Sequence, residues 1–187
     1  MPTVGVFCGS NVGIGDRHLR QAASVGREAA LRGYSVIVGG GLVSCMGAVA
    51  EAARHCGAHV DVIVPRVIME RSCLDDLPDD ALVTDDIWEW KREIGRRADA
   101  FLVLPGGLGT LTELLEVWSG RTLGTHYKPI AVVDAEGVFA PLRDFVVRLV
   151  DLGFSRTASM NVLSWAASAA EAFDHLERHP AAEQPAG

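Results

Sequence analysis

The sequence predicts an α/β protein with a Rossmann-like, doubly wound fold, in which a mainly parallel sheet carries helices on both faces. Short, continuous runs of apolar and β-branched residues alternate with longer segments that have helical spacing, and such runs are typical of strands that are buried on both faces. Three glycine-rich turns also follow predicted strands, which is where folds of this kind bind their ligands.

The first half of the chain contains three predicted strands, and each one ends at a glycine-rich turn or at a proline. The helices between them have small apolar residues on one face. We expect strands at residues 3–8, 34–38 and 59–64, helices at residues 16–32 and 46–56, and an irregular, acidic stretch at residues 66–80.

The second half repeats the alternation. We expect a short strand at residues 82–83 and strands at 100–104, 129–133 and 161–165. We expect a helix capped by Asp85 or Asp86 that runs to about residue 98, a helix that opens at residues 105–110 and ends near 123–124, and helices at 138–152 and 168–178. The chain shows no internal repeat and no linker. It therefore reads as a single domain over residues 1–179, followed by a flexible tail at residues 180–187.

Composition excludes several classes of protein. The 187 residues contain 17 basic and 24 acidic side chains, a net charge of −7, which argues against binding a nucleic acid polymer. No apolar run reaches the ~20 residues that a membrane span needs, and no basic region precedes the first strand, so we expect no membrane association and a cytoplasmic location. The cysteines are scattered and the aspartates of residues 75–80 read as a solvated loop, so we expect no metal site.

The glycine-rich turns are the candidate functional segments. They lie at residues 9–13, 39–41 and 106–109, and the third opens a predicted helix. The free amides and positive dipole end of such a helix favour an anion such as phosphate, and the Thr110 hydroxyl is placed to assist. Glu113 follows three residues later, and its spacing allows two interpretations: a catalytic carboxylate, or the distal half of a capping box with Thr110.

At this point the residues carry a family resemblance. The segment Pro105-Gly106-Gly107-Leu108-Gly109-Thr110-Leu111-Thr112-Glu113 resembles the PGGxGTxxE signature of the LONELY GUY (LOG) family. Members of that family are phosphoribohydrolases that release the free base from cytokinin riboside 5′-monophosphates or from ordinary nucleotides. The likeness extends over nearly the whole chain, including Cys8-Gly9-Ser10, Met46-Gly47 after the second glycine turn, and Gly124-Thr125-His126-Tyr127-Lys128-Pro129.

The resemblance implies a set of site residues. It implies that the loop from Gly106 to Thr110 holds the 5′-phosphate, that Glu113 is the catalytic carboxylate and that Lys91 assists it. It implies no metal and no organic cofactor, a nucleoside 5′-monophosphate as substrate, and a homodimer. The substrate-binding positions that it implies, whether or not the residue agrees with the family's, are Gly106, Gly107, Leu108, Gly109, Thr110, Trp90, Gly9, Ser10, Gly40, Gly41, Met46, Arg71 and Ser72.

The chain departs from the family's pattern at three positions. Trp90 stands where the family has a catalytic arginine, Ser72 stands where many members have a glutamate, and Ser44 stands where the second glycine turn usually continues with glycine. Trp90 has two interpretations: it packs the core on the inner face of a helix, in step with Ile87 and Ile94, or its ring stacks on the base. The resemblance therefore implies an altered base specificity.

Two other functions stay open on the sequence alone. A protein that kept the fold and the phosphate loop but lost turnover would bind a nucleotide or a phosphorylated cofactor without cleaving it. A lysine decarboxylase would need a lysine that binds pyridoxal, and Lys91 and Lys128 are the only lysines in the chain. Whether Arg66, Arg71 or Arg121 replaces the missing guanidinium is also open.

Overall fold

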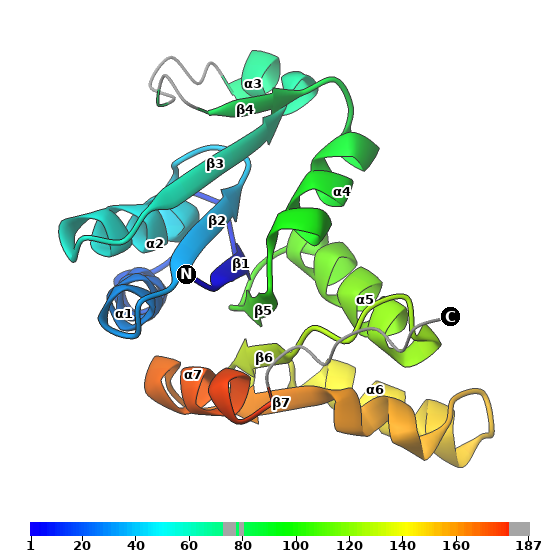
Figure 1. Ribbon diagram of the computed structural model, residues 1–187. Helices are drawn as coiled ribbons and strands as arrows, with labels where there is room; N and C mark the ends of the chain where they lie inside the picture. The colour runs from blue at the N-terminus through cyan, green and yellow to red at the C-terminus, as the bar shows by residue number, and fades with distance from the viewer. Residues whose placement is uncertain (73–77, 79–80, 180–187) are drawn as a thin grey trace.

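A computed structural model describes residues 1–72, 78 and 81–179. Seven strands form one sheet in the order β4-β3-β2-β1-β5-β6-β7, and all six pairings between neighbours are parallel, which confirms the predicted fold class (Figure 1). The strands are β1 (Thr3–Phe7), β2 (Ser35–Gly39), β3 (Val60–Pro65), β4 (Leu82–Thr84), β5 (Ala100–Val103), β6 (Ile130–Val133) and β7 (Leu163–Ala166).

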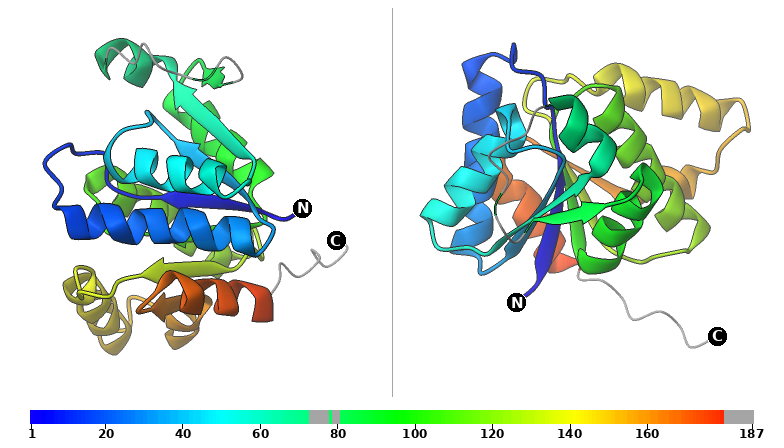
Figure 2. Two further views of the ribbon diagram at one scale, coloured as in Figure 1. Left: turned by 90° about the vertical axis from the view of Figure 1, so that its left-hand side faces the viewer. Right: turned by 90° about the horizontal axis from the view of Figure 1, so that it is seen from above.

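Helices cover both faces of the sheet, as a doubly wound fold requires (Figures 1 and 2). One face packs against α1 (Asp16–Leu31), α2 (Ser44–His55) and α7 (Ala169–Arg178), and the other packs against α4 (Ile87–Arg97), α5 (Leu108–Leu123) and α6 (Ala140–Asp151). A 3₁₀ helix at Thr157–Val162 leads into β7. Among the helices of the described residues, none has the length and apolarity to cross a membrane.

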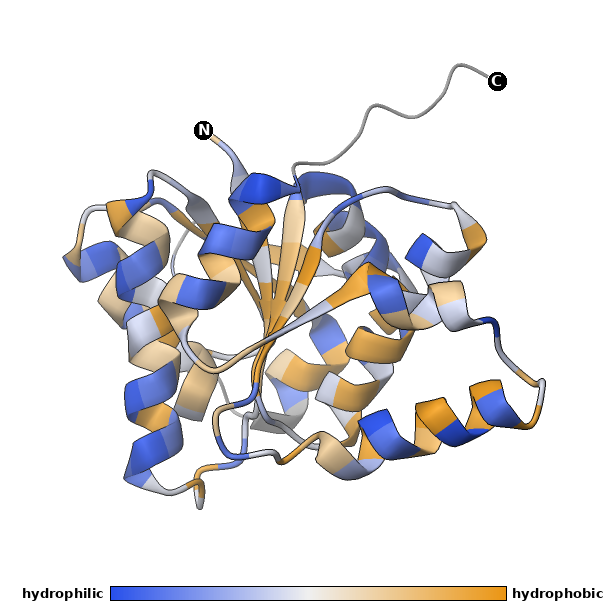
Figure 3. Cartoon of the chain, turned by 90° about the horizontal axis from the view of Figure 1, so that it is seen from below, coloured by the Kyte–Doolittle hydropathy of each residue, from blue (hydrophilic) through white to orange (hydrophobic). Residues whose placement is uncertain are grey.

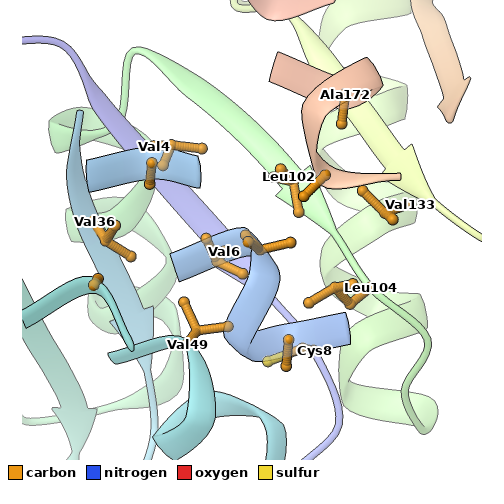
Figure 4. Close-up of a cluster of buried hydrophobic side chains, with 14 of the residues drawn as sticks. Val4, Val6, Cys8, Val36, Val49, Leu102, Leu104, Val133 and Ala172 are labelled. Atoms are coloured by element: carbon orange, nitrogen blue, oxygen red, sulfur yellow. The ribbon is translucent and has the colours of Figure 1, made fainter. Parts of the chain in front are cut away.

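The strands are apolar throughout because successive side chains enter two different cores. Val4 and Val6 of β1 point into the layer beneath α1 and α2, whereas Phe7 belongs to the layer beneath α4 and α5. Figure 3 shows the hydrophobic strands gathered between the helices, and Figure 4 shows the first of the two cores, to which three neighbouring strands contribute Val36, Val6 and Leu102. This double burial explains why the strands were visible in the sequence as continuous apolar runs.

One predicted segment is wrong. The stretch expected to be irregular at residues 66–80 begins with a short helix, α3 (Arg66–Ser72), directly after β3. Seven residues make only about two turns, so the segment is too short to display a helical period in its sequence. The rest of that acidic stretch, apart from residue 78, and the tail predicted at residues 180–187 lie outside the described residues.

The order of the strands places the ligand crevice. The chain runs outward from β1 to β4 and then returns to β5 on the other side of β1, so the strand order reverses between β1 and β5. Ligands bind at this point in doubly wound folds, beyond the carboxyl ends of the strands. The two loops that leave these strands are joined there, because the Gly9 amide donates to the Pro105 carbonyl oxygen over 3.3 Å.

Candidate functional site

A cavity of about 350 Å³ lies at the carboxyl ends of β1, β2 and β5. The sequence-predicted residues converge on it from four separate segments of the chain. Those that line it are Ser10, Gly40, Gly41, Met46, Trp90, Gly107, Leu108, Gly109, Thr110 and Glu113. The topology of the sheet therefore brings the glycine turns together with the segment around Glu113 in one place.

The start of α5 forms one wall of this cavity. Gly107 precedes the helix as its N-cap, and no side chain caps it. Within the described residues, the amide groups of Leu108, Gly109 and Thr110 donate to no acceptor. Three free N–H groups at the positive end of a 16-residue helix form a binding place for an anion.

The loop before this helix requires glycine at residue 106. A Cβ atom at that position would lie 2.9 Å from the Gly9 amide nitrogen and would collide with the Thr110 hydroxyl oxygen. Thr110 itself is buried, with an exposed fraction of 4%, so it cannot move aside. The close approach of the two loops thus explains why Gly106, the second residue of the segment 105–113, is a glycine.

The capping-box interpretation of Thr110 and Glu113 is wrong. It needs Thr110 as the N-cap, but α5 begins two residues earlier, at Leu108. Thr110 is therefore the third residue of the helix and Glu113 the sixth. In that position the Glu113 side chain is not used to close the end of the helix and projects into the cavity wall.

Glu113 lies in an unusual electrostatic environment. Its side chain is partly buried, and among the described residues its carboxylate has no hydrogen-bond or ion-pair partner. Burial raises its pKa from about 4.5 to about 8, the nearby charge of Lys91 opposes this rise, and Glu116 adds to it. Carboxylic acids with a strongly raised pKa in a cavity are candidates for chemistry.

Trp90 packs in the core, which is the first of the two interpretations that the sequence left open, and stacking on a base stays a prediction. It is 8% exposed and packs in the core with Ile94, although Ile87 is 42% exposed and does not share that face. Its indole N–H donates to the Ile63 carbonyl oxygen over 2.9 Å. The ring fills the space that a Cβ atom on Gly39 would occupy, at 2.5 Å, and it also lines the cavity.

No arginine side chain of the described residues lines the cavity. Arg121 donates to the carbonyl oxygens of Tyr127 and Lys128, near the far end of α5. Arg66 is exposed and lies 3.4 Å from Asp85. The side chain of Arg71, the third candidate, lies outside the described residues.

Both lysines of the chain are engaged. Lys91 forms an ion pair of 2.6 Å with Glu116. It also lines a second cavity, of about 170 Å³, which adjoins the first because Glu113 lines both. The Lys128 ammonium donates to the Gly95 carbonyl oxygen over 2.5 Å. Neither lysine lines the cavity of the glycine turns.

Several predicted residues lie just outside the main cavity. Gly9 and Gly106 line an adjacent cavity of about 340 Å³, which shares Ser10 and Gly107 with it. Ser72, like Arg71, ends α3, and its side chain lies outside the described residues. Four further residues line the cavity that were not named among the substrate-binding positions: Cys8, Gly39, Val43 and Ile68.

Signals for two of these residues were present in the sequence. Cys8 and Gly39 adjoin or belong to predicted glycine turns, whereas Ile68 lies in the segment that was expected to be irregular.

Ser44 is held in a conformation that favours glycine. Its φ angle is +53°, and it is the one non-glycine residue of the described chain with a positive φ. Its hydroxyl donates to the Asn11 carbonyl oxygen over 2.7 Å. This bond ties the turn after β2 to the turn after β1 and offsets part of the conformational cost.

Over the same described ranges, no group of three histidine, cysteine, aspartate or glutamate side chains is arranged to hold a metal ion. The site is therefore built from backbone amides, one partly buried carboxylate and apolar walls.

Comparison with known proteins places the chain in a family. Residues 46–176 match the family model described as "Possible lysine decarboxylase". The cytokinin riboside 5′-monophosphate phosphoribohydrolase of Mycobacterium tuberculosis is 44% identical over 161 residues, which cover 86% of each chain. An Arabidopsis thaliana protein of the same name is 36% identical over 174 residues, covering 93% of this chain and 80% of its own.

Solved structures share the fold at low identity. The molybdenum cofactor carrier protein of Chlamydomonas reinhardtii has a TM-score of 0.66 and 16% identity, over 95% of this chain and 98% of that one. The X-ray structure of TM1055 has a TM-score of 0.69 and 22% identity, over 95% and 99% of the two chains. At these identities the likeness concerns the fold.

Proposed function

Since the chain belongs to the LONELY GUY (LOG) family, we propose that it is a nucleoside 5′-monophosphate phosphoribohydrolase. It adds water across the N-glycosidic bond and releases the free base and ribose 5-phosphate. The observation that carries this proposal is the presence, in one cavity, of an uncapped helix N-terminus and a partly buried carboxylate without a partner among the described residues. The first suits the phosphate and the second suits the ribose.

The proposed mechanism uses the N-terminus of α5 for binding and Glu113 for chemistry. The free amides of Leu108, Gly109 and Thr110 bind the 5′-phosphate, which fixes the ribose near Glu113. Cleavage of the glycosidic bond passes through a state like an oxocarbenium ion, with positive charge on the ribose. The ionised Glu113 carboxylate stabilises that charge and orients the attacking water, and the reaction needs neither a metal nor an organic cofactor.

The base specificity is proposed to differ from that of the family because of Trp90. Its N–H is already bonded to Ile63, so it offers the substrate an aromatic surface and no hydrogen-bond donor. Val43, Met46 and Ile68 add apolar surface to the same cavity. A planar base gains about 1–3 kcal/mol by stacking on an aromatic ring, but the wall cannot neutralise charge on the leaving base.

The alternative function is a nucleotide or phosphorylated-cofactor binding protein without turnover. It is favoured by one observation: no guanidinium from the described residues lines the cavity. In this alternative the phosphate-binding wall works as before, and the ligand leaves unchanged.

We also propose that the protein is a homodimer of the cytoplasm. Several large apolar side chains on α4, α5 and the segment around α6 are exposed, and such side chains favour burial against a second chain. Among them are Trp88 at 68%, Leu123 at 75%, Phe145 at 57% and Phe154 at 80% exposed. Light scattering of the purified protein measures the mass: twice 19.9 kDa supports the dimer, and 19.9 kDa contradicts it.

A chromatographic screen for released base tests the proposed function. The protein is incubated with AMP, GMP, CMP, UMP, IMP and isopentenyl-AMP, with the corresponding nucleosides and the Glu113→Gln variant as controls. Release of base from a monophosphate and not from its nucleoside supports the proposal and identifies the base. Binding of a monophosphate, seen as a thermal shift, without release across the panel would instead favour the binding protein.

The specificity proposal is tested at Trp90. In Trp90→Arg, the ratio of kcat/KM for AMP to that for the preferred monophosphate is expected to rise about tenfold, because a donor replaces an aromatic wall. This variant also loses the bond to Ile63, so its melting temperature is measured in parallel. Trp90→Phe is the matched control, since it loses the same bond but keeps a ring. An identical substrate profile in all three proteins would show that Trp90 only packs.

A further inference from the structure

Two glutamate side chains, one of them Glu113, and a lysine side chain line the second cavity. Glu113 and Glu116 lie one turn apart on α5, and Lys91 faces both from α4, so that all three line the second cavity. We propose that Glu116 is a positioning residue, which holds Lys91 away from Glu113 and so keeps the Glu113 carboxylate available to the substrate. This inference rests on the proposed function, in which Glu113 acts on the ribose.

Lys91 is fixed from two sides. Its ammonium nitrogen lies 2.6 Å from a Glu116 carboxylate oxygen and 5.4 Å from the centre of the Trp88 ring. The Lys91 side chain is only 20% exposed, whereas Glu116 is 41% exposed. A cation that is held by a carboxylate and an aromatic ring has little freedom to turn toward a second carboxylate.

Without Glu116, Lys91 is free to turn toward Glu113. The two groups line the same small cavity, and Glu113 has no ion pair in the described part of the chain. An ion pair between them would neutralise the carboxylate that the proposed mechanism directs at the ribose. Glu116 therefore diverts the cation while leaving it close enough to act on Glu113 through space.

The other titratable groups around Glu113 are neutral. Burial raises the pKa of the Cys8 thiol, at the end of β1, well above its usual value. Burial lowers the pKa of His126, which follows α5 and whose ring bonds to the Val117 carbonyl oxygen. Lys91 from α4 and Glu116 from α5 are thus the charged groups of the described residues that set the state of Glu113.

The ionisation of Glu113 sets the direction in which kcat/KM changes with pH. The pKa of Glu113 is raised to about 8, so the carboxyl group is protonated below that pH and ionised above it. Since the ionised form stabilises the ribose cation, kcat/KM is expected to fall as the pH drops through about 8. Removing the negative charge of Glu116 and freeing Lys91 both favour ionisation of Glu113 and move this acid limb to lower pH.

The test is Glu116→Gln, with two readouts. In protein labelled with ¹³C at the glutamate carboxyl carbons, the Glu113 resonance, assigned by its loss in Glu113→Gln, is expected to titrate at least one pH unit lower than in the wild type. The plateau of kcat/KM at high pH is expected to fall, because Lys91 then pairs with Glu113. The acid limb is expected to move with the titration, so that one unit below the wild-type midpoint the rate relative to each protein's own plateau rises several-fold, up to about tenfold. Glu51→Gln, a change at an exposed carboxylate on α2, is the matched control and leaves both unchanged.

The same substitution in a variant without Lys91 distinguishes the positioning role of Glu116 from direct repulsion between Glu116 and Glu113. In Lys91→Met, which keeps the length of the side chain, Glu116→Gln is expected to shift the Glu113 titration less than it does in the presence of Lys91. Equal shifts in both backgrounds, or no shift at all, would overturn the positioning role. If the wild type releases no base, the proposed function fails, yet the resonance of Glu113 still decides the inference.

Discussion

The two walls of the nucleotide cavity are built in different ways. The wall from α5 presents backbone amides at a helix N-terminus, and it needs only glycines and a buried threonine to keep them accessible. The wall from α4 presents a side chain, Trp90, at the position where the family resemblance implies an arginine. Most side-chain substitutions leave backbone amides in place, so they are expected to preserve the α5 wall. The α4 wall consists of side chains, so a single substitution there changes its chemistry.

This difference separates binding from chemistry. In the proposed function the α5 wall holds the phosphate, and its free amides suit any phosphorylated ligand of suitable size. The α4 wall and Glu113 are proposed to act at the far end of the ligand. Substitutions on the two walls are therefore expected to affect different parameters, and the predictions below test that separation.

The largest effect is expected at Glu113. Glu113→Gln removes the charge that stabilises the ribose cation, so kcat is expected to fall about 1,000-fold while the affinity for the nucleotide stays within about threefold. Base release and equilibrium binding are measured on the same preparation. Full activity in this variant would remove Glu113 from the mechanism.

The same variant is expected to change the pH dependence of stability. Because the pKa of Glu113 is raised to about 8 in the folded protein, the folded chain binds a proton that the unfolded chain releases above about pH 4.5. The free energy of unfolding of the wild type therefore decreases as the pH rises from about 4.5 to about 8. In Glu113→Gln this contribution is absent, so the decrease is expected to be smaller. Urea denaturation at pH 5 and pH 8.5 measures it.

The next effect is expected at the helix N-terminus. Leu108 is the first residue of α5 and is 82% exposed, so Leu108→Pro removes one amide donor at a position where helices accept proline. The dissociation constant for the nucleotide is expected to rise about 10- to 100-fold, the value of one hydrogen bond to a charged group. Leu108→Ala, which keeps the amide, is the control. Equal affinities in the two variants would mean that this amide does not contact the phosphate.

The smallest effect is expected at Ser44. Ser44→Ala loses the bond to Asn11 but keeps a side chain in the left-handed region, so the free energy of unfolding is expected to fall by about 1 kcal/mol. Ser44→Gly loses the same bond and relieves a conformational cost of similar size, so its stability is expected to match that of the wild type. Urea denaturation compares the three proteins. A glycine variant less stable than the alanine variant would contradict this account.

The sequence was sufficient for the fold and for the α5 wall because both depend on local patterns. Strands buried on both faces appear as apolar runs, and the anion-binding wall is encoded in the contiguous segment from Gly106 to Thr110. The short helix α3 was missed because two turns carry no readable period. The choice between a capping box and a free carboxylate stayed open because a spacing of three residues does not reveal where the helix begins.

The α4 wall depends on contacts between distant parts of the chain. The bond from Trp90 to Ile63 spans 27 residues, and the ion pair from Lys91 to Glu116 spans 25. Nothing in the local sequence around residue 90 indicates that its indole N–H is already bonded to β3. The structure was needed to show that Trp90 belongs to the core and lines the cavity as well.

The contact between Trp90 and Gly39 has an evolutionary consequence. The indole ring occupies the volume that a side chain at residue 39 would need, so as long as tryptophan is present at residue 90 only glycine is accepted at residue 39. A smaller residue at 90 would lift that restriction and leave a void beside β2. The two positions are therefore expected to covary among relatives, and a return from tryptophan to a cationic residue would require compensating changes beside it.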